Sequence, residues 1–78
     1  MVMDYAEALS WFRKAADKGS RYAEVMIGEM YIRGYGVPQD YAKAASWFEK
    51  AANQGDLNGQ EELATMYENG WGVSQNYV

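Results

Sequence analysis

The sequence repeats itself with a period of 36 residues. When residues 4–39 are aligned with residues 40–75, 17 of the 36 positions are identical. A period of this length is typical of one supersecondary unit that buries its apolar face by stacking on its neighbours. The repeat therefore predicts a functional surface on a stack rather than an enclosed pocket. The segments that recur are Asp4-Tyr5-Ala6, Ser10-Trp11-Phe12, Lys14-Ala15-Ala16, Met30-Tyr31 and Gly34-x-Gly36-Val37.

The first half of each repeat has the apolar spacing of an amphipathic helix. Residues 4–17 place their apolar side chains on one arc and their charged side chains on the opposite arc, at 100° per residue. Asp4 is the expected N-cap, Glu7 completes a capping-box pattern, and Gly19 ends the helix. The apolar arc holds Tyr5, Ala8, Leu9, Trp11, Phe12, Ala15 and Ala16.

The second half of each repeat predicts another helix. It spans residues 20–33, with Ser20 as N-cap, and Gly34 and Gly36 end it. Val25 is expected on its outer side. The two-residue break before it forces an antiparallel hairpin of two helices. Its expected apolar arc holds Ala23, Met26, Ile27, Met30 and Tyr31.

The second repeat follows the same plan, with helices over residues 40–53 and 56–69 and a break at Gly55. Two of the departures of its last helix from the first repeat matter most. Gly59 replaces an alanine, which weakens a helix interior by roughly 0.5–1 kcal/mol. The doublet Glu61-Glu62 replaces Val25 and Met26, so this helix is either a polar cap that faces water or a divergent repeat.

The recurring aromatic side chains predict packing in the core and between repeats, because they keep helical spacing and return after 36 residues. A stacking platform for bases or sugars is the alternative. The methionines of the same arcs are expected to fill gaps in the core. The aromatic residues concerned are Trp11, Phe12, Tyr31, Trp47, Phe48 and Tyr67.

Composition excludes several functional classes. The 78 residues contain neither cysteine nor histidine, which removes the commonest zinc ligands and every Ser-His or Cys-His nucleophile pair. The net charge of −4 argues against nucleic acid as a partner. No apolar run is long enough to span a membrane. Residues 1–4 lack the features of a signal peptide, so a cytoplasmic location is the default expectation.

Two short motifs suggest chemistry but do not support it. The turn over residues 34–39 has two glycines of a nucleotide-binding loop, but it lacks the third glycine, a preceding strand and a P-loop lysine. Glu61 and Glu62 point about 100° apart on a helix, so they are badly placed as an acid–base pair. We therefore expect no enzyme, no metal site and no cofactor.

The recurring residues resemble the Sel-one-like repeat, a relative of the tetratricopeptide repeat, over nearly the whole chain. The pattern Ala8-x-x-Trp11-Phe12-x-Lys14-Ala15-Ala16-x-x-Gly19 carries the resemblance, followed by Gly28, Met30-Tyr31 and Gly34-x-Gly36-Val37. The resemblance implies an all-α fold, a right-handed α/α superhelix (solenoid) of two helix-turn-helix repeats. It also implies a scaffold for protein–protein interaction.

We divide the chain into repeat one (4–39), repeat two (40–75) and the stub of a third repeat (76–78). Repeat one has equal numbers of acidic and basic residues, whereas repeat two has an acidic excess of four. The excess favours a basic partner or is a solvated helix face. Because terminal repeats have an uncovered apolar side, we expect either a longer array or self-association through the exposed repeat ends.

The polar arc of the first helix of each repeat is the candidate site for a protein or peptide partner. In tetratricopeptide-like arrays these helices line the concave side. The alternative is that the arc only keeps the protein in solution, in a structural segment of a longer array with no ligand of its own. The candidate residues are Glu7, Ser10, Arg13, Lys14, Lys43, Ser46, Glu49 and Lys50. Tyr22 and Tyr35 are further candidates for an interface.

Overall fold

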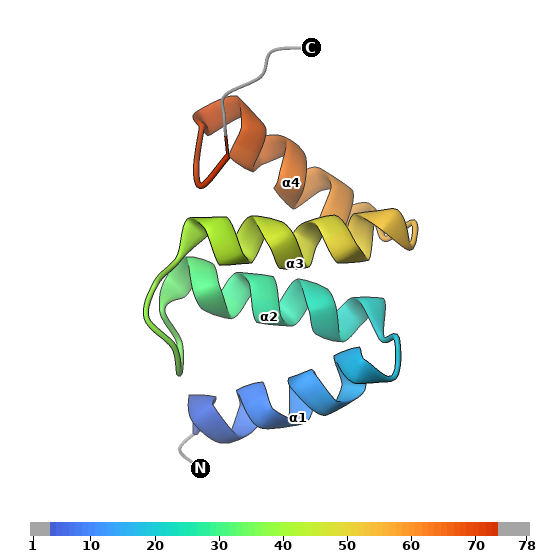
Figure 1. The fold of residues 1–78 in the computed structure, drawn as a ribbon, viewed down its shortest axis with the longest axis vertical. Helices are drawn as coiled ribbons and strands as arrows, with labels where there is room; N and C mark the ends of the chain where they lie inside the picture. Colours follow the sequence, from blue (N-terminus) through green and yellow to red (C-terminus); the bar gives the residue numbers. More distant parts are fainter. Residues whose placement is uncertain (1–3, 74–78) are drawn as a thin grey trace.

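The structure, a computed structural model, describes residues 4–73. These residues form four helices and no strand (Figure 1). Each helix begins one residue later than its predicted bound, because the first predicted residue is the N-cap, and each ends where predicted. The stub expected at 76–78 lies outside the described residues. The helices are α1 (Tyr5–Asp17), α2 (Arg21–Arg33), α3 (Tyr41–Asn53) and α4 (Leu57–Asn69).

Short-range signals fix these bounds. Every N-cap side chain accepts a hydrogen bond from a backbone N–H in the first turn of its helix, which satisfies a donor that the helix itself leaves unpaired. Gly34 and Gly70 end α2 and α4 in the left-handed conformation, with φ of 70° and 68°. The N-caps are Asp4, Ser20, Asp40 and Asp56.

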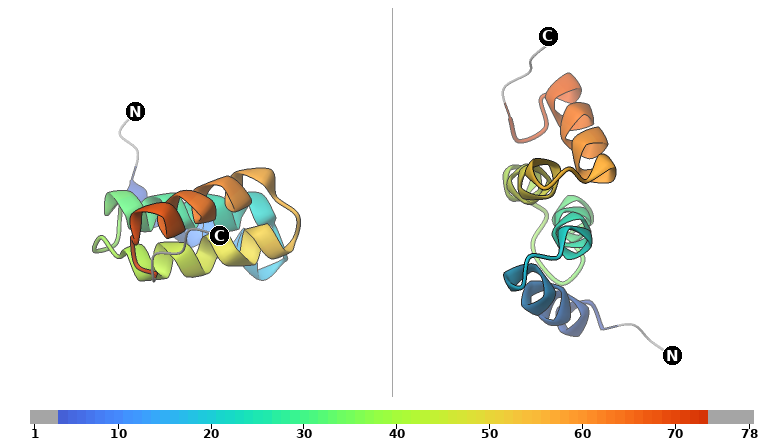
Figure 2. Two further views of the ribbon diagram at one scale, coloured as in Figure 1. Left: turned by 90° about the horizontal axis from the view of Figure 1, so that it is seen from above. Right: turned by 90° about the vertical axis from the view of Figure 1, so that its right-hand side faces the viewer.

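The four helices stack in chain order along the longest axis of the molecule, which measures 42 × 24 × 18 Å (Figure 1). Each helix packs against the next one, and the packing of α2 against α3 is the most extensive. Seen from the side, α3 lies to the left of α2 and α4 (Figure 2, right). Among the described residues, no helix is long and apolar enough to cross a membrane.

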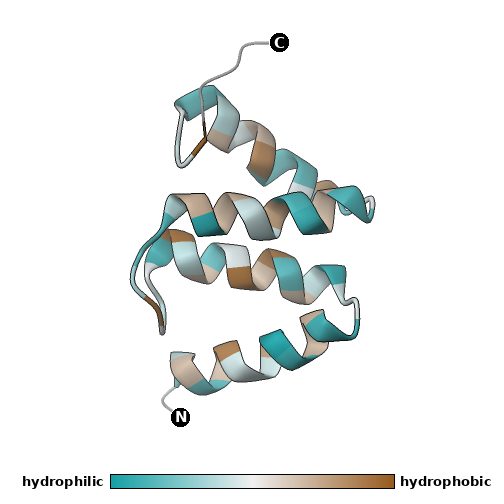
Figure 3. Cartoon of the chain, viewed as in Figure 1, coloured by the Kyte–Doolittle hydropathy of each residue, from teal (hydrophilic) through white to brown (hydrophobic). Residues whose placement is uncertain are grey.

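The core lies in the middle of this stack. Phe48, Ile27 and Met66 are the largest side chains that are fully buried. Hydrophobic and hydrophilic segments alternate along every helix, as amphipathic helices require (Figure 3). The predicted packing between repeats is therefore confirmed for Phe48, which comes from repeat two and lies against α2 of repeat one.

The prediction that Trp11 is a packing residue is wrong. Its exposed fraction is 64%, whereas Trp47, one repeat later, is half-buried and packs against the core. The reason is position in the stack: α3 lies between α2 and α4, but among the described helices only α2 packs extensively against α1. Periodicity marks a position as apolar without showing whether a second helix covers it.

The expected outer side of α2 is also wrong, because this helix is buried on two sides. Val25 has an exposed fraction of 9%, and Glu24 and Gly28 are buried as well. Glu24 accepts a hydrogen bond of 2.7 Å from Gln54 Nε2, and Arg21 donates to the Gln54 carbonyl oxygen at 3.2 Å. These two bonds tie α2 to the end of α3.

Two glycines allow neighbouring helices to approach closely. A Cβ atom at Gly28 would lie 2.7 Å from Cε1 of Phe48, so no larger residue fits there without movement of the buried ring. A Cβ at Gly59 would lie 2.9 Å from Cβ of Ala51. Gly59 is therefore a packing residue between α3 and α4, in addition to its expected effect on helix propensity.

Candidate functional site

The structure places all eight predicted partner-binding residues on the exposed surface of α1 and α3. We call this set the polar face. Four of its members are cations and two are carboxylates, so it carries a positive balance on a chain whose net charge is −4. The polar face consists of Glu7, Ser10, Arg13, Lys14, Lys43, Ser46, Glu49 and Lys50.

Two lysines of the polar face lie over tryptophan rings in equivalent positions of the two repeats. Lys14 Nζ is 4.9 Å from the ring centroid of Trp11, and Lys50 Nζ is 4.4 Å from that of Trp47. Residues three apart on a helix are neighbours on its surface, which produces both pairs. A cation over an exposed ring gains about 0.5–1 kcal/mol. The contacts therefore favour one position of each ammonium group, over its ring.

Tyr31 of α2 connects the cations of the two helices. Its hydroxyl accepts a hydrogen bond of 2.9 Å from Arg13 Nη2, and Lys43 Nζ lies 5.8 Å from its ring centroid. Tyr31 was predicted to lie in the core, and its exposed fraction of 6% confirms this. Its polar role was missed, although a buried tyrosine hydroxyl usually finds a partner.

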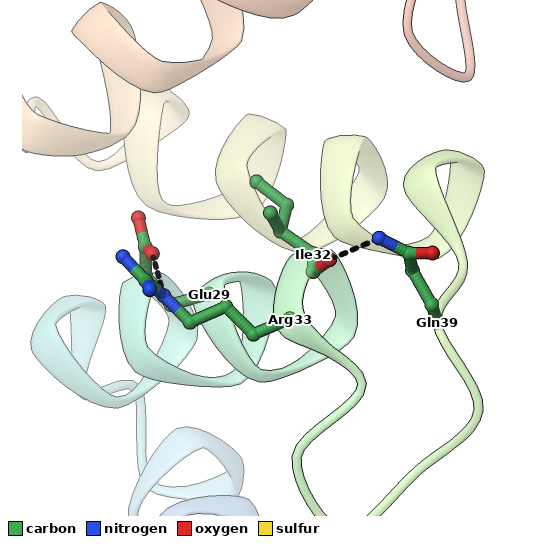
Figure 4. A network of polar contacts seen from close by, with 4 residues as sticks. All are labelled: Glu29, Ile32, Arg33 and Gln39. Atoms are coloured by element: carbon green, nitrogen blue, oxygen red, sulfur yellow. Dashed lines mark hydrogen bonds and ion pairs between the residues drawn. The ribbon is translucent and has the colours of Figure 1, made fainter.

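The turn after α2 contacts both α1 and α2. Gln39 Nε2 donates to the carbonyl oxygen of Ile32 at 2.7 Å, close to the end of α2 (Figure 4). Tyr35 stacks on Tyr5 at a centroid distance of 4.3 Å. Tyr35 was expected at an interface with a partner; in the structure its ring packs on α1, and 37% of its surface stays exposed.

An apolar groove, which sequence analysis did not predict, lies between α1 and α2. Its volume is about 390 Å³. On its rim, Glu29 and Arg33 form an ion pair of 3.5 Å (Figure 4). Hydrogen bonds to Tyr35 and Glu29 raise the pKa of Arg33, so this side chain stays a cation. We call this feature the α1–α2 groove; it is lined by Tyr5, Ala8, Phe12, Met26, Glu29, Met30, Arg33 and Tyr35.

Glu62 brings a second carboxylate close to Glu29. Partial burial, the charge of Glu29 and a hydrogen bond to it raise the pKa of Glu62, and Glu61 adds to the effect. Arg33 acts in the opposite direction. The interaction of Glu62 with Glu29 links α4 to α2, although these two helices do not pack extensively against each other.

We expect Glu62→Gln to stabilise the protein at neutral pH. The raised pKa means that the native state binds the Glu62 proton more tightly than the unfolded chain does. Wild-type stability therefore falls as pH rises from the ordinary glutamate value of 4.5 through the raised value. Because Glu62 is half-exposed, we expect a gain of about 0.5 kcal/mol, or about 2–4 °C in melting temperature.

Thermal melts followed by circular dichroism at neutral pH and below pH 4.5 test this prediction. The gain should shrink at the acidic pH, where Glu62 is protonated in wild type. Glu49→Gln, at an exposed glutamate on α3, is the matched control and should show no such change. An equal gain for Glu62→Gln at both pH values would contradict the prediction.

Comparison with known proteins identifies the repeat. The sequence profile described as "Sel1 repeat" matches residues 3–20, 21–56 and 57–78. The longest of the three matches begins with α2 and ends after α3, so its bounds differ from those of our two repeats. The division into residues 4–39 and 40–75 stays a prediction. Comparison with curated proteins gives no match.

Two solved structures have the same fold. One is the crystal structure of c5321, a protective antigen present in uropathogenic Escherichia coli strains and displaying an SLR fold, with a TM-score of 0.92 and 44% identity. The other is a Sel1 repeat protein from Oxalobacter formigenes, with a TM-score of 0.85 and 43% identity.

The two matches cover most of this chain but a smaller share of each related chain. They cover 95% and 87% of this chain, but only 16% and 52% of the chains from Escherichia coli and Oxalobacter formigenes. The helical arrangement, the recurring residues and the profile agree along nearly the whole sequence. The chain therefore belongs to the Sel1 repeat family.

Proposed function

We propose that this protein is a non-catalytic scaffold that binds a protein partner through the polar face. The observation that carries the proposal is the pair of lysines held over tryptophan rings at equivalent positions of α1 and α3. Ordered side chains lose less conformational freedom when a partner binds than mobile ones do. Sel1 repeats commonly mediate protein interactions, which supports the same function.

The charge of the polar face favours an acidic partner segment. Its four cations lie on α1 and α3, on either side of α2 in the stack, and Tyr31 of α2 contacts both Arg13 and Lys43. An extended segment with carboxylates at more than one position would contact both repeats. Because these cations are exposed, each contact contributes only about 0.2–1 kcal/mol, and binding should weaken as salt is added.

A pull-down tests the proposal. We expect Lys14→Glu/Lys50→Glu to lose the proteins that wild type retains, with a loss of affinity of about 5–30-fold, because two attractive contacts become repulsive. Lys18→Glu is the control, since Lys18 is an exposed lysine outside the polar face, after the end of α1. If the double variant retains the same proteins as wild type, the polar face is not the binding surface.

The second candidate function is that of a structural segment in a longer repeat array, without a ligand of its own. It is favoured by the length of the two solved relatives, of which this chain spans 16% and 52%. The same pull-down distinguishes the two functions. A structural segment would retain no protein specifically, and the lysine variants would behave as wild type does.

A further inference from the structure

Two cations of the polar face, one from each repeat, contact the same buried tyrosine. Tyr31 belongs to α2 and packs in the core, with an exposed fraction of 6%. Its hydroxyl accepts the hydrogen bond from Arg13 of α1, and its ring faces the ammonium group of Lys43 of α3. The core therefore fixes the position of one hydroxyl group beside two positive charges.

Neither of these two cations is neutralised by the protein itself. Among residues 4–73, no carboxylate forms an ion pair with Arg13 or with Lys43. Asp40 is the N-cap of α3, and its carboxylate accepts the backbone N–H of Lys43 rather than the ammonium group. An anion bound beside Tyr31 would therefore interact favourably with two charges that have no other partner.

The three groups still have hydrogen-bond donors to offer. Because the Tyr31 hydroxyl accepts from Arg13, its own proton can be donated, and no group of the described residues accepts it. A hydroxyl that accepts from a cation is also a better donor, because hydrogen bonds in a chain polarise one another. Arg13 spends one of its several N–H groups on Tyr31. The remaining donors fit a ligand that only accepts hydrogen bonds, such as an ionised carboxylate.

Repeat two indicates that the bond between Arg13 and Tyr31 is not required for packing within a repeat. A shift of 36 residues takes Tyr31 to Tyr67 and Arg13 to Glu49. Glu49 is exposed, and no group of the described part of the chain is hydrogen-bonded to the Tyr67 hydroxyl. Nevertheless, α3 packs against α4. The cations at Tyr31 are thus a feature of one repeat, as expected of a binding site rather than of a framework contact.

We propose that Arg13, Tyr31 and Lys43 form a binding site for one carboxylate side chain of a partner protein, which we call the Tyr31 site. The Tyr31 hydroxyl and the Arg13 guanidinium donate hydrogen bonds to the carboxylate, and the ammonium group of Lys43, on its flexible stem, approaches it from α3. Because the core already fixes Tyr31, this side chain loses little freedom on binding. The proposal rests on the function proposed for the polar face, and adds the position at which that face recognises an acidic segment.

A short acidic peptide tests the Tyr31 site directly. The probe is a capped peptide in which glutamate alternates with serine, titrated into isotope-labelled protein and followed by nuclear magnetic resonance. The arginines of the chain are Arg13, Arg21 and Arg33, and only the Nε–H signal of Arg13 should shift in a saturable manner. The same peptide with glutamine in place of glutamate should cause no such shift, because it lacks the charge.

Two variants separate the Tyr31 site from a general attraction between charges. Tyr31→Phe keeps the ring in the core and removes only the hydroxyl, so we expect peptide affinity to fall about 3–10-fold. Arg13→Lys keeps the charge but loses the planar guanidinium, and should weaken binding by a similar factor. Because both residues act through one chain of hydrogen bonds, the double variant should bind about as weakly as either single variant.

Lys18→Gln is the control for charge, because Lys18 is exposed and lies outside the polar face, after the end of α1. It should change peptide affinity by less than about twofold, since salt screens distant charges. Affinities are measured from backbone amide shifts, and circular dichroism shows whether the variants keep their helices. Arg13 is exposed, so the test of Arg13→Lys does not depend on how the core tolerates Tyr31→Phe.

Several results would overturn the inference. If Tyr31→Phe and Arg13→Lys bind the peptide as tightly as Lys18→Gln does, binding follows charge alone. Equal shifts of all three arginine signals, or no binding to wild type, would also exclude the Tyr31 site. A phosphoserine peptide that binds where the glutamate peptide does not would make phosphate the ligand. The proposed function is tested separately, because the pull-down with Lys14→Glu/Lys50→Glu can succeed even if the Tyr31 site fails.

Discussion

Phe48→Ala should destabilise the protein by about 3–5 kcal/mol, which corresponds to a fall in melting temperature of about 15–30 °C. Phe48 is fully buried, and its ring contacts α2 while its backbone lies against Gly59 of α4. Its removal leaves a cavity in the middle of the stack, and the surrounding helices can close that cavity only in part. A domain of this size has little stability to lose.

Phe12→Ala is the matched control, because the same residue occupies the same place in the first repeat. Phe12 is half-buried and lines the open α1–α2 groove, so its truncation removes less packing. We expect a loss of about 1–2 kcal/mol. Chemical denaturation of both variants measures the difference. Equal losses would show that α1 and α3 are equally covered, which would contradict the exposed position of the groove.

The helices could be predicted from the sequence because local signals determine where they begin and end. An Asp or Ser N-cap precedes every helix, and a glycine in the left-handed conformation follows within two residues of each helix end. Both signals act through hydrogen bonds to the nearest turn. Each signal can be recognised from the few residues around a helix end. Because of the period of 36, each signal also occurs in both repeats.

Burial could not be predicted equally well, because it depends on which helices lie on either side. Trp11 and Trp47 both stand in the segment Ser-Trp-Phe-x-Lys-Ala-Ala, yet only Trp47 is half-buried and packs against the core. Val25 was expected on the outer side because one buried face was expected for α2. In the structure α2 packs against both α1 and α3, so Val25 is buried. Position in the stack, rather than amphipathicity, decides these cases.

The candidate site was predictable in part for a similar reason. The exposure of the polar face follows from helical periodicity, and the structure agrees for all eight residues. The link from Arg13 through Tyr31 to Lys43 spans three helices, and no spacing in the sequence indicates it. The α1–α2 groove is likewise a space between two helices that the sequence does not reveal. Whether the polar face binds a partner stays a prediction.

Gly36→Ala is expected to have a second large effect, at least about 3 kcal/mol or about 12–24 °C in melting temperature. Gly36 has a φ of 75°, a conformation that costs an alanine about 1–2 kcal/mol. In addition, a Cβ atom there would lie 2.8 Å from the backbone carbon of Tyr5. The backbone fixes the position of the Cβ atom, and the Tyr5 carbon is itself a backbone atom, so neither can turn aside and the clash moves the turn away from α1.

Gly19→Ala separates the two contributions. Gly19 also has a positive φ, 89°, but a Cβ atom there would meet no atom within 4 Å. It should therefore cost only the conformational strain, about 1–2 kcal/mol. Thermal melts compare the two variants, and near-ultraviolet circular dichroism reports whether Tyr35 still stacks on Tyr5. If the two substitutions lower the free energy of unfolding by the same amount, a Cβ atom at position 36 does not clash with α1. The close contact between the turn and Tyr5 would then not fix the shape of this side of the α1–α2 groove.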